Sequence, residues 1–171
     1  MTVYRTMRLP RDRVRGRLLV PQDVAERTWE ALRTFEGAAG PHEGLVFWAG
    51  RRVGDLAFVI GAMIPDAHHG PVRVIASERA VGHAARTARR FGLAIVAQVH
   101  SHPSDDTRHS DGDDRLVLMP YEGMFSLVIG DYGAGSVGVH QFQDGRWVQV
   151  DPVDEQAFAV VPAVTDLRVN R

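Results

Sequence analysis

The sequence predicts an α+β domain with a layered α-β-α arrangement, in which helices flank a mixed β-sheet. Short apolar runs of strand length recur along most of the chain. Two longer segments carry apolar residues at helical spacing instead. The resulting order is strand, helix, several strands, helix, strand, short helix and strands, which is typical of a layered domain. With 171 residues, 44% of them hydrophobic, the chain can bury one core, so a single domain is expected.

We predict this domain at residues 17–150, between a basic extension at residues 1–16 and a tail at residues 151–171. The extension alternates arginine with apolar residues, which is typical of an arm or a short strand. Its charge either guides an acidic partner or keeps the arm solvated. Prolines and acids in the tail indicate a segment that covers a sheet edge or stays mobile.

The strands are expected where apolar runs lie between turn residues. In chain order they cover residues 17–20, 44–49, 56–64, 72–76, 124–129, 137–142 and 147–150, with one further buried strand that begins at residues 93–97 and runs on to His100. Helices are expected over about fifteen residues after Pro21, and over residues 77–91 and 111–119. Gly37 and Gly40 end the first of these, and its apolar face is expected to pack on the sheet.

Two polar features of these segments allow more than one interpretation. The second helix carries a basic side, which is either a solvated face or a docking face for an acidic partner. Residues 65–71 are predicted as a loop that contains His68 and His69. Neighbouring side chains on an extended chain point to opposite sides, so these histidines make poor joint ligands for one ion. Lining the substrate groove is the alternative role for this loop.

A metal site is indicated after the apolar strand of the second half. His100 and His102 project to the same side of an extended segment, and Pro103 then stops the strand. After a polar loop, Ser110 and Asp113 follow with S-x-x-D spacing. Two imidazoles and one carboxylate are three zinc ligands of the kind that leaves a fourth position open for water.

Taken separately, both halves of this pattern have simpler interpretations. The histidines are also compatible with ordinary surface or core positions, and S-x-x-D is typical of a helix start with a capping serine. The whole pattern H-x-H-P-x6-S-x-x-D arises by chance on the order of once in ten thousand chains of this length. His109, in the same polar loop, is either a further ligand or, as its surroundings favour, a solvent-facing or substrate-positioning residue.

With these residues, the sequence resembles the JAMM (MPN-plus) metalloprotease family of JAB domains, and the match at all five motif positions is complete. Among the nearby acids only Asp113 has the family's spacing. In that family a glutamate precedes a short apolar strand that ends in glycine, near the start of the domain. Residues 41–50 have this form, so the resemblance makes Glu43 the candidate catalytic glutamate. It implies the family's fold across about residues 17–150.

The resemblance also implies a reaction. Zn²⁺ would be held by His100, His102 and Asp113, and zinc lowers the pKa of a water to about 7. Glu43 would take the proton of that water and pass it to the leaving amine. The Ser110 hydroxyl would donate to the developing oxyanion.

Members of this family typically cleave isopeptide or peptide bonds after the C-terminal tail of ubiquitin or a ubiquitin-like protein. The compact chain resembles the bacterial members, so a ubiquitin-like tail or its conjugate is the expected substrate. Processing of a sulfur-carrier protein is the alternative within enzymes. A non-catalytic MPN scaffold and a nucleic-acid role like that proposed for RadC relatives stay open as well, the last supported only by the N-terminal arginines.

Composition narrows the setting. The net charge of −1 creates no overall electrostatic attraction toward nucleic acid or a membrane surface, so neither is indicated as a partner. No apolar run is long enough to span a bilayer, and the N-terminus lacks the apolar core of a signal peptide, so a cytoplasmic location is expected by default. There are no cysteines, so a zinc site must use nitrogen and oxygen ligands. All 20 basic residues are arginines. This composition reflects either a genome rich in G and C, or a protein that acts alongside lysine-modifying enzymes and avoids modification by having no lysine.

Overall fold

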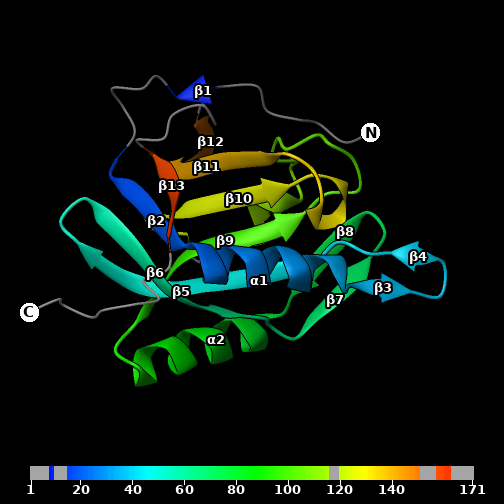
Figure 1. Ribbon diagram of the computed structural model, residues 1–171, viewed down its shortest axis with the longest axis horizontal. Coiled ribbons are helices and arrows are strands. Elements are labelled where there is room, and N and C mark those ends of the chain that lie inside the picture. The colour runs from blue at the N-terminus through cyan, green and yellow to red at the C-terminus, as the bar shows by residue number, and fades with distance from the viewer. Residues whose placement is uncertain (1–7, 10–14, 116–119, 151–156, 163–171) are drawn as a thin grey trace, which may run out of the picture.

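A computed structural model of the chain describes residues 8–9, 15–115, 120–150 and 157–162 (Figure 1). Two α-helices are described, α1 (Gln22–Arg33) and α2 (Glu78–Arg90), together with the short 3₁₀ helices η2 (Asp113–Arg115) and η3 (Asp131–Gly133). The strands are β1 (Arg8–Leu9), β2 (Arg17–Pro21), β3 (Glu36–Gly37), β4 (Gly40–Pro41), β5 (Leu45–Val53), β6 (Leu56–Met63), β7 (Ala67–Gly70), β8 (Arg73–Ala76), β9 (Ala94–Ser101), β10 (Phe125–Ile129), β11 (Val137–Gln143), β12 (Arg146–Val150) and β13 (Phe158–Val161).

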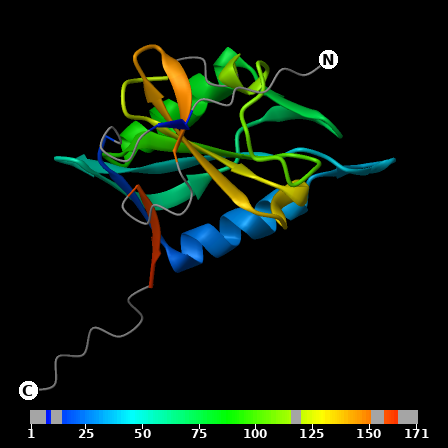
Figure 2. The ribbon, with the colours of Figure 1, turned by 90° about the horizontal axis from the view of Figure 1, so that it is seen from above.

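Nine of these strands form one mixed sheet in the order β1-β12-β11-β10-β9-β5-β6-β2-β13. Strand β9 lies at its centre, antiparallel to β5 and parallel to β10. Alternate residues of β5 enter different cores: Val46 and Trp48 join the core under α1, whereas Leu45 and Phe47 join the core under α2. Figures 1 and 2 show the two helices on opposite sides of the sheet. The predicted α+β class with a mixed sheet flanked by helices is therefore confirmed.

The larger core lies between α1 and the sheet and is organised around Trp48. Its side chain is fully buried and stacks on Trp29, with ring centroids 5.9 Å apart, and on Phe158, with centroids 6.4 Å apart. The indole N–H donates to the Thr28 hydroxyl of α1 at 2.8 Å, so the one polar atom of this side chain is satisfied within the core.

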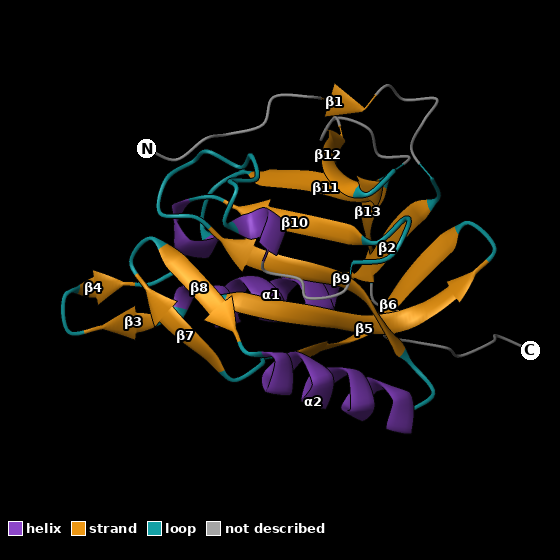
Figure 3. Cartoon of the chain, turned by 180° about the vertical axis from the view of Figure 1, so that it is seen from behind, coloured by secondary structure: helices purple, strands orange, loops and turns teal. Residues whose placement is uncertain are grey.

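The smaller core lies under α2, which approaches the sheet closely because its buried residues are alanines. Ser77 begins the helix as the sequence predicts, and its hydroxyl accepts from the Ala80 amide at 3.2 Å. Figure 3 shows the β7–β8 hairpin on the same side as α2, and Val74 and Ala76 of β8 join this core.

The prediction of a loop at residues 65–71 is wrong, because Ala67–Gly70 forms strand β7, which pairs antiparallel with β8. His68 and His69 lie opposite Ile75 and Val74. In the sequence, the two histidines and the Gly70-Pro71 pair indicate a loop, but the glycine and proline mark only the turn between these two strands.

Further expectations differ in their bounds or lie partly outside the described residues. Helix α1 ends at Arg33, and the short hairpin β3–β4 follows it. In place of a helix at residues 111–119 there is η2, and residues 116–119 are not described. Most of the extension at residues 1–16 and most of the tail at residues 151–171 lie outside the described residues. Within those segments β1 pairs with β12 and β13 pairs with β2. No helix among the described residues is long and apolar enough to cross a membrane.

Leu32 tests the packing of α1 on the sheet, because its side chain is fully buried in the larger core. We expect Leu32→Ala to lower the free energy of unfolding by about 2–5 kcal/mol, since it removes buried methyl groups and leaves a cavity. Urea unfolding followed by circular dichroism measures the loss. Ile60→Ala, at a 49% exposed position on β6, is the control and should cost much less. Equal losses at both positions would contradict the assigned core.

Candidate metal centre

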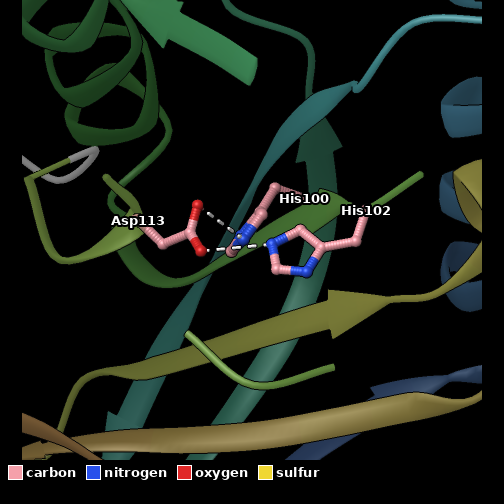
Figure 4. Close-up of side chains that lie close together, drawn as sticks. All are labelled: His100, His102 and Asp113. Carbon is pink, nitrogen blue, oxygen red and sulfur yellow. Dashed lines mark hydrogen bonds and ion pairs between the residues drawn. The ribbon is translucent and has the colours of Figure 1, made fainter. Parts of the chain in front are cut away.

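Strand β9 carries the first two site residues into the middle of the protein. His100 is fully buried near the end of β9, opposite Leu45 of β5 and Val128 of β10. His102 follows the strand directly, and its amide donates to the Ile129 carbonyl at 2.9 Å, continuing the contact with β10. As expected for positions i and i+2, the ring nitrogens of the two histidines approach the same carboxylate (Figure 4).

Ser110 and Asp113 hold each other at the start of η2. The Ser110 amide donates to the Asp113 carboxylate at 2.6 Å, and the Asp113 amide donates to the Ser110 hydroxyl at 3.3 Å. This reciprocal pair has the pattern of a capping box, with the acid shortened to aspartate. The S-x-x-D spacing therefore acts locally as a helix start and also aims the carboxylate, as the sequence indicates.

The three predicted ligands meet in one cluster. His102 Nε2 lies 3.1 Å from Asp113 Oδ2, and His100 Nε2 lies 3.4 Å from Asp113 Oδ1. One ligand atom from each residue lies within 4.8 Å of the others, and all three residues are buried (Figure 4). Among the described residues, this is the one group of three or more histidine, cysteine, aspartate or glutamate side chains that could hold a metal ion.

The charges of the cluster depend on one another. Burial favours the neutral form of Asp113, but the charges and hydrogen bonds of His100 and His102 outweigh it and hold the pKa of that carboxyl well below its usual range. Burial lowers the pKa of His100, and the attraction of Asp113 only partly opposes this. Burial also acts to lower the pKa of His102, but its hydrogen bond to Asp113 and the nearby carboxylate charge raise it overall.

The cluster suits a metal ion in its chemistry as well as its geometry. Within the part of the chain that the structure describes, Nδ1 of His100 is buried without a hydrogen-bond partner, and Nε2 has only the 3.4 Å contact with Asp113, although buried polar atoms are normally paired. The Nδ1–H of His102 donates to the Asp106 carbonyl at 2.7 Å, because a carbonyl can only accept. The Nε2 of His102 is thereby turned toward Asp113, the arrangement that a metal-binding histidine requires.

Glu43 lies in the loop before β5, outside the three-residue cluster but within its electrostatic reach. Its side chain is 5% exposed, and burial raises its pKa to about 7. The charge of His102 lowers this pKa and that of Asp113 raises it. A carboxyl group with such a pKa can take up and release a proton near neutrality.

The backbone around Glu43 is held from two directions that the sequence does not reveal. The Glu43 amide donates to the Gly70 carbonyl at 2.8 Å, and the Glu43 carbonyl accepts from Nδ1 of His69 at 3.0 Å. The His69 ring stacks on Phe35, with ring centroids 4.2 Å apart. From the sequence, His69 is expected in a loop. The strand predicted at residues 72–76, directly after the Gly70-Pro71 pair, is the signal that could have indicated a hairpin here.

The loop that holds Glu43 is also joined to the ligand strand. Ser101, between the two histidines, donates its amide to the Gly44 carbonyl at 3.1 Å, and its hydroxyl accepts from the Gly44 amide at 2.9 Å. The motif alone indicates for Ser101 no more than a role in shaping the turn. His109 is expected to be a further ligand, a solvent-facing residue or a substrate-positioning one. It is buried, with 3% of its surface exposed, so it does not face solvent, and it is not part of the three-residue cluster.

The fold and site together define a mixed α+β domain with a buried His-His-Asp cluster that could bind a metal ion. The chain belongs to the family described as prokaryotic homologues of the JAB domain, whose model matches residues 25–144. The resemblance inferred from the motif is thus confirmed at the level of the family.

Solved structures agree with this assignment at the level of fold. The solution structure of protein DSY2949 from Desulfitobacterium hafniense is 18% identical, with a TM-score of 0.66 over 86% of this chain and 95% of that one. The solution structure of a protein from Salinibacter ruber is 16% identical, with a TM-score of 0.55 over 89% of this chain and 95% of that one. No protein with a curated description matches the sequence.

The raised pKa of Glu43 has a consequence for stability. Between its ordinary value of 4.5 and about 7, the folded state binds more protons than the unfolded state, so stability falls as pH rises through this range. We therefore expect Glu43→Gln to stabilise the metal-free protein by on the order of 3 kcal/mol at about pH 8, and by little at about pH 4.5. Urea unfolding in the presence of a chelator measures both values.

The control for this measurement is Glu36→Gln, which makes the same chemical change at an exposed position on β3. Its effect should be small and similar at the two pH values. If Glu43→Gln gave the same change in unfolding free energy at both pH values, the assigned burial of the Glu43 carboxyl would be wrong.

Proposed function

We propose that the protein is a zinc peptidase that cleaves the peptide or isopeptide bond after the C-terminal tail of a ubiquitin-like protein. The observation that carries the proposal is the placement of Glu43, a buried carboxyl with a pKa of about 7, within electrostatic reach of the His100, His102 and Asp113 cluster. Membership of the prokaryotic JAB family supports it. A non-catalytic scaffold would not need to retain both the ligands and the acid.

Zinc is the metal favoured by the donors. Two imidazoles and one carboxylate suit Zn²⁺, whereas calcium and magnesium prefer sites made of oxygen alone. When bound, zinc supplies Lewis acidity toward a water and toward a substrate carbonyl. Three protein ligands leave a coordination position open, which is typical of a catalytic rather than a structural site.

Two side chains would then move or stabilise charge. Glu43 would accept the proton of the attacking water and deliver it to the leaving amine, since its pKa lies near working pH. The Ser110 oxygen accepts from the Asp113 amide, so the hydroxyl hydrogen can point toward a developing oxyanion. The same contact fixes the hydroxyl group at one end of η2.

The hairpin that holds Glu43 also offers a place for an extended tail. Within the described residues β8 pairs only with β7, so its outer edge presents backbone groups to a further strand. An extended peptide that added there would gain main-chain hydrogen bonds. The same hairpin contacts the backbone of Glu43 through Gly70 and His69 of β7, so the element that would receive the tail also supports the acid.

Metal binding is the first test. We expect the wild type to bind one zinc ion per chain, and His102→Ala to lose stoichiometric binding because a ligand is missing. Equilibrium dialysis with metal analysis measures this. His68→Ala removes an exposed histidine of β7 and should bind zinc like the wild type. Retention of the ion by His102→Ala would place the metal elsewhere.

Activity is the second test. A panel of ubiquitin-like and sulfur-carrier domains, each fused through its C-terminal tail to a reporter, is incubated with zinc-loaded protein. We expect release of the reporter from at least one fusion. Glu43→Gln should reduce the rate by about 10²–10⁴-fold, since it removes a general acid–base group.

Glu36→Gln is again the matched control and should cleave at the wild-type rate. Zinc-loaded wild type that releases no reporter from any fusion would count against the proposed substrate class. Cleavage that persists unchanged in Glu43→Gln would remove the proposed mechanism.

A further inference from the structure

His109 stands immediately before the segment that supplies Ser110 and Asp113, and it is almost completely buried. We propose that His109 is a positioning residue of the metal centre, whose ring ties the η2 segment to the strands beside the histidine ligands. The inference rests on the proposed metal centre and is independent of peptidase activity.

A chain of hydrogen bonds runs through the His109 ring. Its Nδ1 lies 3.3 Å from the Asp114 carboxylate, and its Nε2 lies 2.9 Å from the Ser126 hydroxyl of β10. The Ser126 hydroxyl oxygen also accepts a hydrogen bond from the side-chain Nε2 of Gln98 on β9, at 2.9 Å.

The Asp114 carboxylate at one end of the chain determines which group donates in each of these hydrogen bonds. A carboxylate can only accept, so the His109 Nδ1 donates to Asp114 and, in the neutral ring, Nε2 accepts from the Ser126 hydroxyl. The chain therefore runs Gln98, Ser126, His109, Asp114. It begins two residues before the ligand His100 and ends one residue after the ligand Asp113.

Aromatic rings enclose His109 on its other sides. Its ring centroid lies 4.1 Å from that of His140, 5.4 Å from that of Trp147 and 5.6 Å from that of His100. The rings of His109 and His100 meet edge to face, so His109 contacts one of the proposed ligands directly. A ring held by two hydrogen bonds and three ring neighbours has little freedom to move.

This anchorage acts where the backbone is irregular. The first half of the loop after His102 has its own attachment, because the Asp105 carboxylate accepts from both the amide and the hydroxyl of Ser136, at 2.9 and 2.6 Å. In the second half, Ser110 and Asp113 bond to each other, and this pair alone does not fix their place relative to β9. Asp113 itself contacts His100 and His102. The His109–Asp114 link adds a connection to the strands that does not depend on these contacts between the proposed ligands.

A ligand that is already in place when the metal arrives binds it more tightly, because less conformational freedom is lost on binding. Loss of a residue that orients a ligand typically lowers metal affinity by about 10–100-fold. We therefore expect His109→Phe, which keeps a ring but removes both hydrogen bonds, to weaken zinc binding by about that factor. Asp114→Ala should do the same, because it breaks the same chain from its outer end.

The experiment measures zinc affinity by competition with a chromophoric chelator, and the visible absorption spectrum of the Co²⁺-loaded proteins. We expect both variants to shift the intensity or wavelength of the Co²⁺ bands, since these report ligand geometry rather than global stability. Asp114→Asn keeps an oxygen that accepts from Nδ1 and should restore wild-type affinity and spectrum. Val139→Ala makes a cavity in the core on the other face of β11 and should lower only the melting temperature.

The possible results distinguish a failure of the metal centre itself from a failure of the positioning role of His109. Wild-type protein that binds neither ion would overturn the metal centre and this proposal with it. Wild-type protein that binds zinc, with His109→Phe and Asp114→Ala matching its affinity and Co²⁺ spectrum, would overturn the positioning role alone. A loss of affinity in Val139→Ala as large as in His109→Phe would also overturn it, because general destabilisation would then explain the effect.

Discussion

The contact between the Asp113 carboxylate and two buried imidazoles is the interaction on which the site depends. An ionised carboxylate buried without a partner is very costly, and Asp113 is only 6% exposed. His100 and His102 meet its two oxygens, one each. This arrangement requires the chain to leave the sheet after β9, cross a loop and return at η2 to the same point. A metal ion held by these residues would replace the direct contact between histidine and carboxylate with shared coordination.

The position of β9 explains how such a polar cluster can be tolerated. From Ala97 to His100 the strand is paired on both sides, so the backbone groups that lead to the site are satisfied before any side chain is considered. The neighbouring strand β5 changes register at Ala49 and Gly50, where the chain passes very close to β6. A Cβ on Gly50 would lie 2.0 Å from the Phe58 carbonyl oxygen, so this position requires glycine. The glycine that follows the predicted strand end at residue 49 therefore belongs to a bulge, and the strand continues to Val53.

The parts of the site that sequence could predict are those set by local geometry. The alternation of an extended chain brings His100 and His102 to one side, and a helix start fixes Ser110 against Asp113. Both depend on residues close together in the chain. His69 and His109 were misplaced because their partners, Glu43 and Ser126, lie 26 and 17 residues away. A histidine in a polar stretch has no local property that distinguishes a solvent-facing ring from one buried by a distant strand. The fold class was predictable for a related reason: it rests on the order of elements, whereas the β7–β8 hairpin depends on a turn that was interpreted as a longer loop.

One desolvated environment meets two opposite requirements at this site. Burial disfavours charge on any group, so it keeps Glu43 protonated up to a pKa of about 7 and at the same time favours the neutral form of His100. A proton acceptor is most useful when its pKa lies near working pH, and a metal ligand is most useful when its nitrogen carries no proton. Asp113 escapes the same effect only because its two histidine partners supply compensating interactions. Had Glu43 been given such partners, its pKa would fall and it would bind protons too weakly to serve as an acid in the second half of a hydrolysis. The separation of Glu43 from the three-residue cluster therefore lets two carboxylates in one environment of low polarity differ in pKa, as the proposed roles of proton acceptor and metal ligand require.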